Sequence, residues 1–139
     1  MIKLDEINEA IHFVSDGESY DNKAYLEKST GKLYFYNGFE QHPEDEDLPK
    51  DIDSNNYILI PSLKELDLKQ TLIFNFALNF VPEYYDEIRD IFRRRKAYRN
   101  YRELLIRIDA LDKWYDFENK STKEKIIEWC VDNDVKYLD

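Results

Sequence analysis

The sequence predicts an α+β fold, with an N-terminal helix and a short antiparallel sheet followed by a helical bundle of about four helices. Apolar residues recur at helical spacing in residues 4–14 and again beyond residue 67. Between them, in residues 23–61, short runs of Tyr, Phe, Leu and Ile are separated by turn-forming residues, which is typical of strands. Only 3 glycines and 4 prolines occur in 139 residues, which argues against disorder and against a many-turned β-sandwich.

The first half of the chain, residues 1–66, contains the predicted first helix and the sheet. The stretch "KAYLEKSTGKLYFYNG" indicates two strands joined at Ser29-Thr30-Gly31, a hairpin, and "NYILIPS" indicates a third strand that ends at Pro61. Residues 40–53 between them form an acidic loop. The apolar residues of "LDEINEAIHFVS" form a helical stripe: Leu4, Ile7, Ala10, Ile11 and Val14.

The second half, residues 67–139, is predicted to be helical. The stretch "DLKQTLIFNFALNF" is apolar almost all round, so we expect a central, buried helix with Asp67 as its N-cap. Pro82 is expected in the first turn of the next helix, "PEYYDEIRDIFRR". A third helix is expected in "KAYRNYRELLIRIDAL", which overlaps the basic segment Arg93–Arg107.

The C-terminal helix is predicted in "STKEKIIEWCVDND", with Ser121 or Thr122 as its cap and Glu124 placed for a capping box. The stretch "DKWYDF" either extends the preceding helix or forms a separate turn, and "VKYLD" is either a final strand or a tail. No repeat or linker divides the chain, so residues 1–139 are predicted to form a single domain. Four aromatic residues are expected to pack between the last two helices or, alternatively, to form an exposed patch for a partner: Trp114, Tyr115, Phe117 and Trp129.

The composition argues against disulfide-stabilised, cysteine-based zinc-binding and membrane-spanning proteins. A single cysteine, Cys130, excludes an internal disulfide framework and a cysteine-based zinc site, and its apolar neighbours indicate an inert core thiol. The longest apolar stretch, Leu72–Val81, is too short to span a bilayer, and no signal peptide is visible at the N-terminus. We therefore expect a soluble cytoplasmic protein without a membrane partner, a metal or another cofactor.

Charge is distributed unevenly along the chain. The net charge is −10, of which residues 1–66 contribute −9 and residues 67–139 contribute −1. Within Arg89–Arg107, however, 8 basic and 2 acidic residues give a net charge of +6. An acidic protein is repelled from nucleic acid and anionic membranes at long range, but a local basic patch can still bind an acidic surface or a phosphate.

Several segments occur in a recognisable order: "EAIHFVSD", a Tyr/Leu strand leading into a Thr-Gly turn, "YILIPS", "FRRRKAYRNYREL", "WYDF" and "IIEWCVDN". Together they resemble the uncharacterised protein family 0158 of the UPF series, over about residues 4–135. The resemblance implies a small bacterial cytoplasmic protein without an assigned activity.

The chain departs from the resemblance in its central stretch. That stretch usually reads Gly-basic-Gly-Ala-aromatic-basic, and here Arg94 and Lys96 stand in place of the two glycines. Ala97, Tyr98 and Arg99 match the pattern. Without the glycines, a tight backbone bend or a phosphate-approach loop is disfavoured, so we expect this region to be continuous helix and more basic.

The candidate binding residues belong to the basic segment. On a helix, Arg95, Arg99 and Arg102 share one face at positions i, i+4 and i+7, and Tyr98 lies beside them. Arginine suits acidic groups and tyrosine can stack on a base. Three interpretations stay open for this face: solvated or paired with acids such as Asp90 and Glu103, in contact with an acidic protein surface, or in contact with a phosphate-bearing ligand.

Other candidate sites are weaker. The acidic loop 40–53, with His42, lacks the spacing of a calcium loop; it is either solvated or lies against the basic face, in the same chain or in a partner copy. His12 is expected to be structural or at the surface, and the sequence contains no glycine-rich phosphate loop and no convincing catalytic triad. The carboxylates Asp86 and Asp90 would act in catalysis only inside a pocket.

These observations favour a non-enzymatic protein-interaction or regulatory module of a bacterial cytoplasm. Its partner is expected to be another protein or a second copy of the chain. The alternative is a nucleic-acid-binding regulatory protein that uses the basic helix Arg93–Arg107. A third possibility, a small enzyme of unknown reaction, would require a concave pocket that holds titratable groups.

Overall fold

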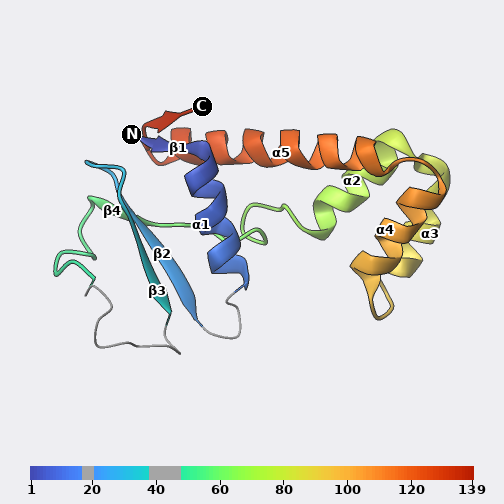
Figure 1. Ribbon diagram of the computed structural model, residues 1–139, viewed down its shortest axis with the longest axis horizontal. Helices are drawn as coiled ribbons and strands as arrows, with labels where there is room; N and C mark the ends of the chain where they lie inside the picture. The colour runs from blue at the N-terminus through green and yellow to red at the C-terminus, as the bar shows by residue number, and fades with distance from the viewer. Residues whose placement is uncertain (17–20, 38–47) are drawn as a thin grey trace. The chain divides into compact units, whose positions relative to one another are not determined.

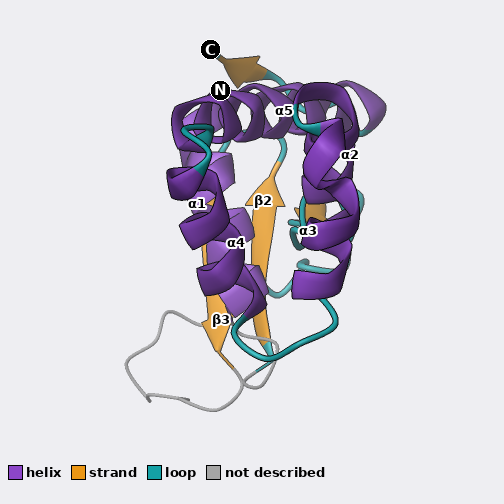
Figure 2. Cartoon of the chain, turned by 90° about the vertical axis from the view of Figure 1, so that its right-hand side faces the viewer, coloured by secondary structure: helices purple, strands orange, loops and turns teal. Residues whose placement is uncertain are grey.

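The computed structural model describes residues 1–16, 21–37 and 48–139 and has the predicted α+β fold. The chain divides into two compact units. Unit 1 consists of Met1–Leu66 and Glu124–Asp139, and unit 2 of Asp67–Lys123. Every strand of the described residues belongs to unit 1, whereas unit 2 is helical (Figure 2).

The larger sheet of unit 1 has three antiparallel strands in the order β3-β2-β4, with helix α1 packed against β2 (Figure 1). The predicted hairpin is confirmed: the N–H of Gly31 donates to the carbonyl of Glu27 at 2.8 Å, and Gly31 adopts a φ of +78°. The third strand is also confirmed. The bounds are α1 Leu4–Asp16, β2 Asn22–Glu27, β3 Leu33–Asn37 and β4 Tyr57–Leu59.

The core of unit 1 lies between α1, the sheet and the last turns of helix α5 (Leu111–Asp132). Burial of the Cys130 thiol in this core raises its pKa to about 11, as expected for an inert thiol. The C-terminal segment is a strand, because β5 (Tyr137–Leu138) pairs in parallel with β1 (Ile2–Lys3). The predicted stripe of α1 is confirmed, with four of its residues buried: Leu4, Ile7, Ala10 and Ile11.

Unit 2 is built around a cluster of aromatic rings. Phe76 is fully buried, and its ring centroid lies 5.3 Å from that of Trp114 and 5.5 Å from that of Phe117. Such edge-on and tilted arrangements stabilise aromatic pairs beyond the burial of their area. The elements that supply the cluster are α2 Gln70–Phe80, η1 Pro82–Tyr84, α3 Tyr85–Ile91, α4 Ala97–Arg107 and the first turns of α5.

Two expectations about α2 are wrong. Asp67 is not its N-cap: it has a left-handed φ of +56°, and the helix starts at Gln70 without a side-chain cap. Nor is the helix buried all round, because Leu78 is 54% exposed while Ile73 and Phe76 are buried. The cluster covers one side of α2, and nothing among the described residues covers the side that carries Leu78.

The predictions for the C-terminal helix are also corrected. Helix α5 is continuous over 22 residues, so "DKWYDF" lies in its first turns and Ser121 and Thr122 lie inside it and cap nothing. The break occurs earlier, where the N–H of Ala110 donates to the carbonyl of Leu105 at 2.8 Å and Asp109 adopts a φ of +57°. This C-terminal motif ends α4, and α5 begins directly after it.

The four aromatic residues near the C-terminus do not form one group. Trp114 is only 8% exposed and belongs to the cluster of unit 2 with Phe117, which rules out an exposed patch at Trp114. Trp129 instead packs against the core of unit 1. The two tryptophans are 15 positions apart in the chain, and they belong to the cores of different units.

Candidate functional site

The basic segment contains a turn that the sequence did not predict. Helix α3 ends at Ile91 and α4 begins at Ala97, so the expected continuous helix is wrong. The N–H groups of Arg93 and Arg94 donate to carbonyls three residues earlier, at 3.1 Å each, and Lys96 then adopts a left-handed conformation with φ +59°. The chain reverses direction here, and α3 and α4 pack against each other (Figure 1).

Phe92 explains why the chain turns despite a run of good helix formers. Its ring lies 5.9 Å from that of Phe74 on α2, 5.2 Å from Tyr98 and 5.6 Å from Tyr101. These contacts hold the end of α3 against the cluster, and the four cationic residues that follow, 93–96, are all exposed. The turn is therefore a consequence of tertiary packing, which overrides local helix propensity.

We call the cations of the turn and of the exposed side of α4 the basic surface. Among them, Arg94 pairs with Asp90 at 3.1 Å and Arg99 pairs with Glu103 at 3.4 Å. Glu103 thus neutralises one arginine of the predicted face, whereas Asp90 pairs with an arginine outside it. Both pairs are exposed and contribute about 0–1 kcal/mol. The basic surface consists of Arg93, Arg94, Arg95, Lys96, Arg99 and Arg102, all exposed.

Four cations of the basic surface have no acidic partner within residues 1–16, 21–37 and 48–139: Arg93, Arg95, Lys96 and Arg102. The nearby Arg107 differs, because it bonds Glu87 at 2.9 Å. From Phe92 to Arg102 inclusive, the chain contains six basic residues and no acidic residue. These four unpaired cations therefore lie close together in the sequence, at the turn and in the first two turns of α4.

The candidate residues occupy two different elements. Tyr98, Arg99 and Arg102 lie on the exposed side of α4, and Tyr98 is 55% exposed although its ring forms a T-shaped contact with that of Phe92. Arg95 precedes α4 in the turn, so the helical spacing that grouped it with the other two arginines does not apply to it. The sequence reading did not single out Ile106, which is 58% exposed one turn beyond Arg102. Ile106 lies off the apolar stripe of α4, and this position in the sequence would have indicated that its side chain is exposed.

Tyr101 is the buried polar residue beneath this surface. Its hydroxyl has no hydrogen-bond partner in the described part of the chain, and burial, followed by the charge of Glu118, raises its pKa. The phenol therefore stays neutral, and its ring serves packing, with its centroid 5.3 Å from that of Trp114.

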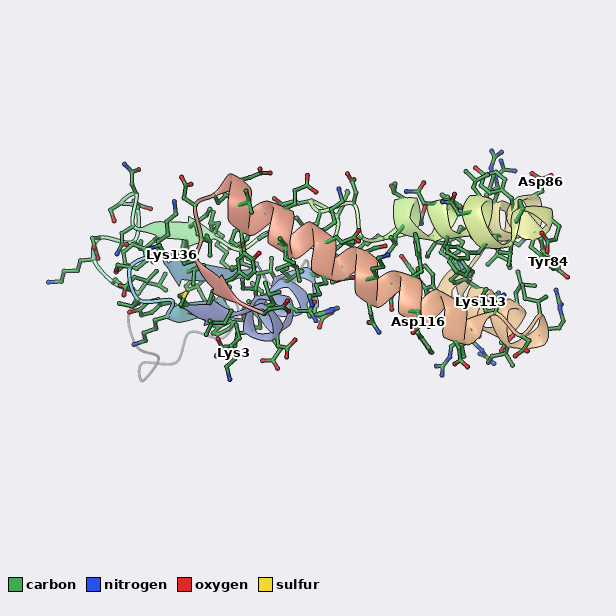
Figure 3. The ribbon with its side chains drawn as sticks, turned by 90° about the horizontal axis from the view of Figure 1, so that it is seen from above. Lys3, Tyr84, Asp86, Lys113, Asp116 and Lys136 are labelled. Atoms are coloured by element: carbon green, nitrogen blue, oxygen red, sulfur yellow. The ribbon has the colours of Figure 1, made fainter. Side chains whose placement is uncertain are left out.

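The carboxylates considered for catalysis lie on exposed helix faces. Asp86 is exposed at the start of α3 (Figure 3), and Asp90 is exposed and paired with Arg94. His12 is exposed on α1, as expected. Across residues 1–16, 21–37 and 48–139, no three His, Cys, Asp or Glu side chains are grouped so that they could hold a metal ion.

Residues 40–47 of the acidic loop, including His42, lie outside the described residues. The predicted contact between this loop and the basic surface therefore stays a prediction. Among the described residues, no helix is both long enough and apolar enough to cross a membrane.

Comparison with known proteins identifies the family. A family model described as "Uncharacterised protein family (UPF0158)" matches residues 1–138. The chain belongs to this family. No curated protein and no solved structure matches the chain.

The turn has a direct bearing on the central stretch of the UPF0158 resemblance, in which glycines stand at the positions of Arg94 and Lys96. Lys96 is the residue with a left-handed backbone, whereas Arg94 has no positive φ. Glycine adopts the left-handed region without the steric cost that a Cβ atom imposes. The tight bend that the absence of the glycines was expected to disfavour is therefore present, with a lysine in its left-handed position.

Lys96→Gly is therefore expected to raise the free energy of unfolding by about 1 kcal/mol, because it removes the left-handed penalty of a side chain. Chemical denaturation monitored by circular dichroism measures this change. Arg95→Gly is the matched control, since it removes an equally unpaired positive charge from a turn residue without positive φ and should lower stability by up to about 1 kcal/mol. Equal effects of the two substitutions would show that the conformation of Lys96 costs nothing.

Proposed function

We propose that this UPF0158 chain is a non-enzymatic binding module of the bacterial cytoplasm, whose basic surface contacts an acidic partner protein. The observation that carries the proposal is the set of four exposed cations without acidic partners in the described residues, all within Phe92–Arg102. A solvated helix face in so acidic a chain would be expected to pair more of its arginines, as Arg94, Arg99 and Arg107 do.

Charge segregation supports a partner that is acidic. Unit 1 carries 20 acidic and 8 basic residues, a net charge of −12, whereas unit 2 carries 10 acidic and 12 basic residues, a net charge of +2. An acidic partner is attracted to the basic surface at short range, while the charge of the rest of the chain limits indiscriminate binding to polyanions. This charge distribution therefore contributes more to the choice of partner than to the affinity for that partner.

The proposed contact residues are Arg95, Tyr98, Arg99 and Arg102. The guanidinium group of arginine binds a carboxylate through two parallel hydrogen bonds. Tyr98 has a half-exposed ring that loses little conformational entropy on binding. The exposed pair of Arg99 with Glu103 is weak enough to be exchanged for a partner's carboxylate. Ile106, exposed on the same helix, would add apolar contact area.

Single-stranded nucleic acid is the second candidate partner, and the exposed ring of Tyr98 beside Arg99 and Arg102 is the observation that favours it. A base stacked on such a ring contributes about 1–3 kcal/mol to binding. The net charge of −10 opposes it. The two candidates differ in what they require of Tyr98, because a carboxylate-rich protein uses the ring far less than a stacked base does.

The test compares the binding of two probes, poly-L-glutamate and a random-sequence single-stranded oligonucleotide, over a range of salt concentrations. Replacing the unpaired arginines, Arg93→Ala/Arg95→Ala/Arg102→Ala, is expected to weaken binding by about tenfold or more. For a nucleic acid, the slope of log affinity against log salt should also fall by roughly 1 for each cation removed. The control Lys64→Ala/Lys113→Ala/Lys120→Ala removes three exposed positive charges outside Arg93–Arg107 and should change binding little.

The outcomes separate the candidates. Binding of poly-L-glutamate that is lost in the first triple variant and kept in the control supports an acidic protein partner. Oligonucleotide binding that also falls about tenfold or more in Tyr98→Ala supports nucleic acid instead. If neither probe binds at low salt, or if both triple variants behave alike, the basic surface is only a solvated helix face and the proposal fails.

A further inference from the structure

Helix α4 exposes two large apolar side chains. Tyr98 and Ile106 are 55% and 58% exposed, which makes them the two most exposed large apolar side chains of unit 2. The inner side of the same helix is buried through Tyr101, Leu104 and Leu105. Single exposed apolar residues are common on protein surfaces, so a role for these two depends on how they lie relative to each other and to the arginines.

The two side chains belong to one row along the helix. Tyr98, Arg102 and Ile106 stand at positions i, i+4 and i+8 of α4. Residues four apart are turned by only about 40° around a helix axis, so rows of this kind form the ridges through which helices pack. We call these three residues the α4 ridge. Its two ends lie about 12 Å apart along the helix axis.

Arg102 is the centre of the α4 ridge and has no acidic partner in the described part of the chain. The acid next to it in the sequence, Glu103, pairs with Arg99 instead. A partner that covered Tyr98 and Ile106 would also remove Arg102 from water. A charge that loses its water must be paired, so such a partner needs a carboxylate between its apolar contacts.

The architecture of unit 2 indicates which kind of partner element fits. Residues 67–123 are described throughout and contain helices and turns but no strand, so they offer no sheet edge to which an extended segment could be added. An exposed row of helix side chains instead packs between the side chains of a second helix. The α4 ridge therefore fits a helix better than a strand.

The apolar end of the ridge favours a protein over a nucleic acid. Arg93, Arg95 and Lys96 precede α4 and have no acidic partner among the described residues, so they attract an acidic ligand of either class. A stacked base could use the ring of Tyr98. The charged phosphate backbone, however, has no apolar side chain with which to cover Ile106. Ile106 is therefore the residue that distinguishes the two classes of ligand.

We propose that the α4 ridge binds an acidic amphipathic helix of a partner protein. On one face, this helix presents a carboxylate between two apolar side chains that are about two turns apart. The carboxylate pairs with Arg102, and the two apolar side chains cover Tyr98 and Ile106. The inference rests on the proposed function, since it specifies the acidic partner by its secondary structure and by the order of its contacts.

The first test compares two synthetic peptides that contain only Glu, Ala and Leu, which are all good helix formers. Both peptides have the same length, composition and charge. The first carries two leucines about two turns apart on one face with a glutamate midway between them, and the second carries its leucines on opposite faces. Fluorescence anisotropy with the 139-residue chain is expected to show that the first peptide binds about tenfold or more tighter than the second.

The second test assigns this preference to the ridge. Ile106→Ala removes most of an exposed apolar side chain and should reduce the preference for the first peptide to about threefold or less. Leu78→Ala is the matched control, because Leu78 is a similarly exposed aliphatic residue of unit 2, 54% accessible, that lies on α2 outside the ridge. This control variant should keep the full preference.

The third test concerns the carboxylate. When glutamine replaces only the midway glutamate of the first peptide, binding to the wild-type chain should weaken about threefold or more. Binding to Arg102→Ala should change much less, because the partner of that carboxylate is already missing. Equal losses for the two chains would show that the carboxylate does not pair with Arg102.

Three further results would overturn the inference. Equal binding of the two peptides to the wild type would show that the basic surface responds to charge alone. In that case the proposed function still stands if poly-L-glutamate binds, and fails too if it does not. An equal preference in Ile106→Ala and Leu78→Ala would place the apolar contact outside the α4 ridge. Finally, a single-stranded oligonucleotide that loses as much affinity in Ile106→Ala as the first peptide does would assign the ridge to nucleic acid.

Discussion

Phe76→Ala is expected to lower the free energy of unfolding of unit 2 by about 3–5 kcal/mol. Phe76 is fully buried. Its ring contacts those of Phe80, Trp114 and Phe117 at centroid distances of 5.1, 5.3 and 5.5 Å. Its removal leaves a cavity at the centre of the cluster and breaks several aromatic contacts at once. Of the substitutions considered for unit 2, this one should have the largest effect.

Urea denaturation followed by tryptophan fluorescence measures the effect, because Trp114 belongs to the cluster that is disrupted. Phe80→Ala is the matched control: it removes a ring of the same cluster that is already 49% exposed, and the expected loss is about 1 kcal/mol. A loss for Phe76→Ala no larger than that for Phe80→Ala would contradict the central position assigned to Phe76.

The two tryptophans also test the predicted single domain. Trp114 reports on unit 2 and Trp129 on unit 1, so single-tryptophan variants follow the two units separately. Helix α5 contributes residues to both units. If the chain is one cooperative domain, Phe76→Ala shifts both transitions to the same denaturant concentration. If only the Trp114 transition moves, the units unfold independently and the single-domain prediction fails.

Gly31→Ala is expected to lower the free energy of unfolding by about 2–4 kcal/mol. Two causes act together. Gly31 has a φ of +78°, which an alanine adopts only with strain, and a Cβ at this position would lie 3.1 Å from the backbone N of Ile2 and from the backbone C of Met1. The hairpin turn is thus packed directly on the start of the chain, where β1 pairs with β5.

Gly31→Asn separates the two causes, because asparagine tolerates the left-handed region but still carries a Cβ. Thermal unfolding of both variants measures the difference. Alanine should destabilise more than asparagine, and asparagine more than the wild-type glycine. If Gly31→Asn were as stable as the wild type, the close approach to Ile2 would have no energetic consequence.

The elements that were predicted correctly have local causes. The stripe that begins at Leu4 and Ile7 specifies an amphipathic helix whatever it packs against, and Gly31 marks the hairpin because it permits a turn that other residues resist. Pro82 likewise begins a helical turn, since its φ is already suitable and its missing N–H is not needed there.

The errors arise where a local signal competes with packing. The capping signal at Ser121 and Thr122 is real as a sequence pattern, but the chain is already helical from Leu111 and passes through it. At Lys96 the propensity for helix yields to the anchoring of Phe92 in the cluster. The candidate binding residues stay a prediction, and Arg95 lies in the turn and not in the helix.

By itself, the sequence determined the class of fold, the hairpin, the membership of the family and the concentration of positive charge between residues 92 and 102. These features depend on composition, periodicity and short-range turn chemistry, all of which neighbouring residues encode. Only the tertiary structure decided which arginines are paired and that Trp114 is buried. Pairing and burial depend on distances that exist only once the core has packed.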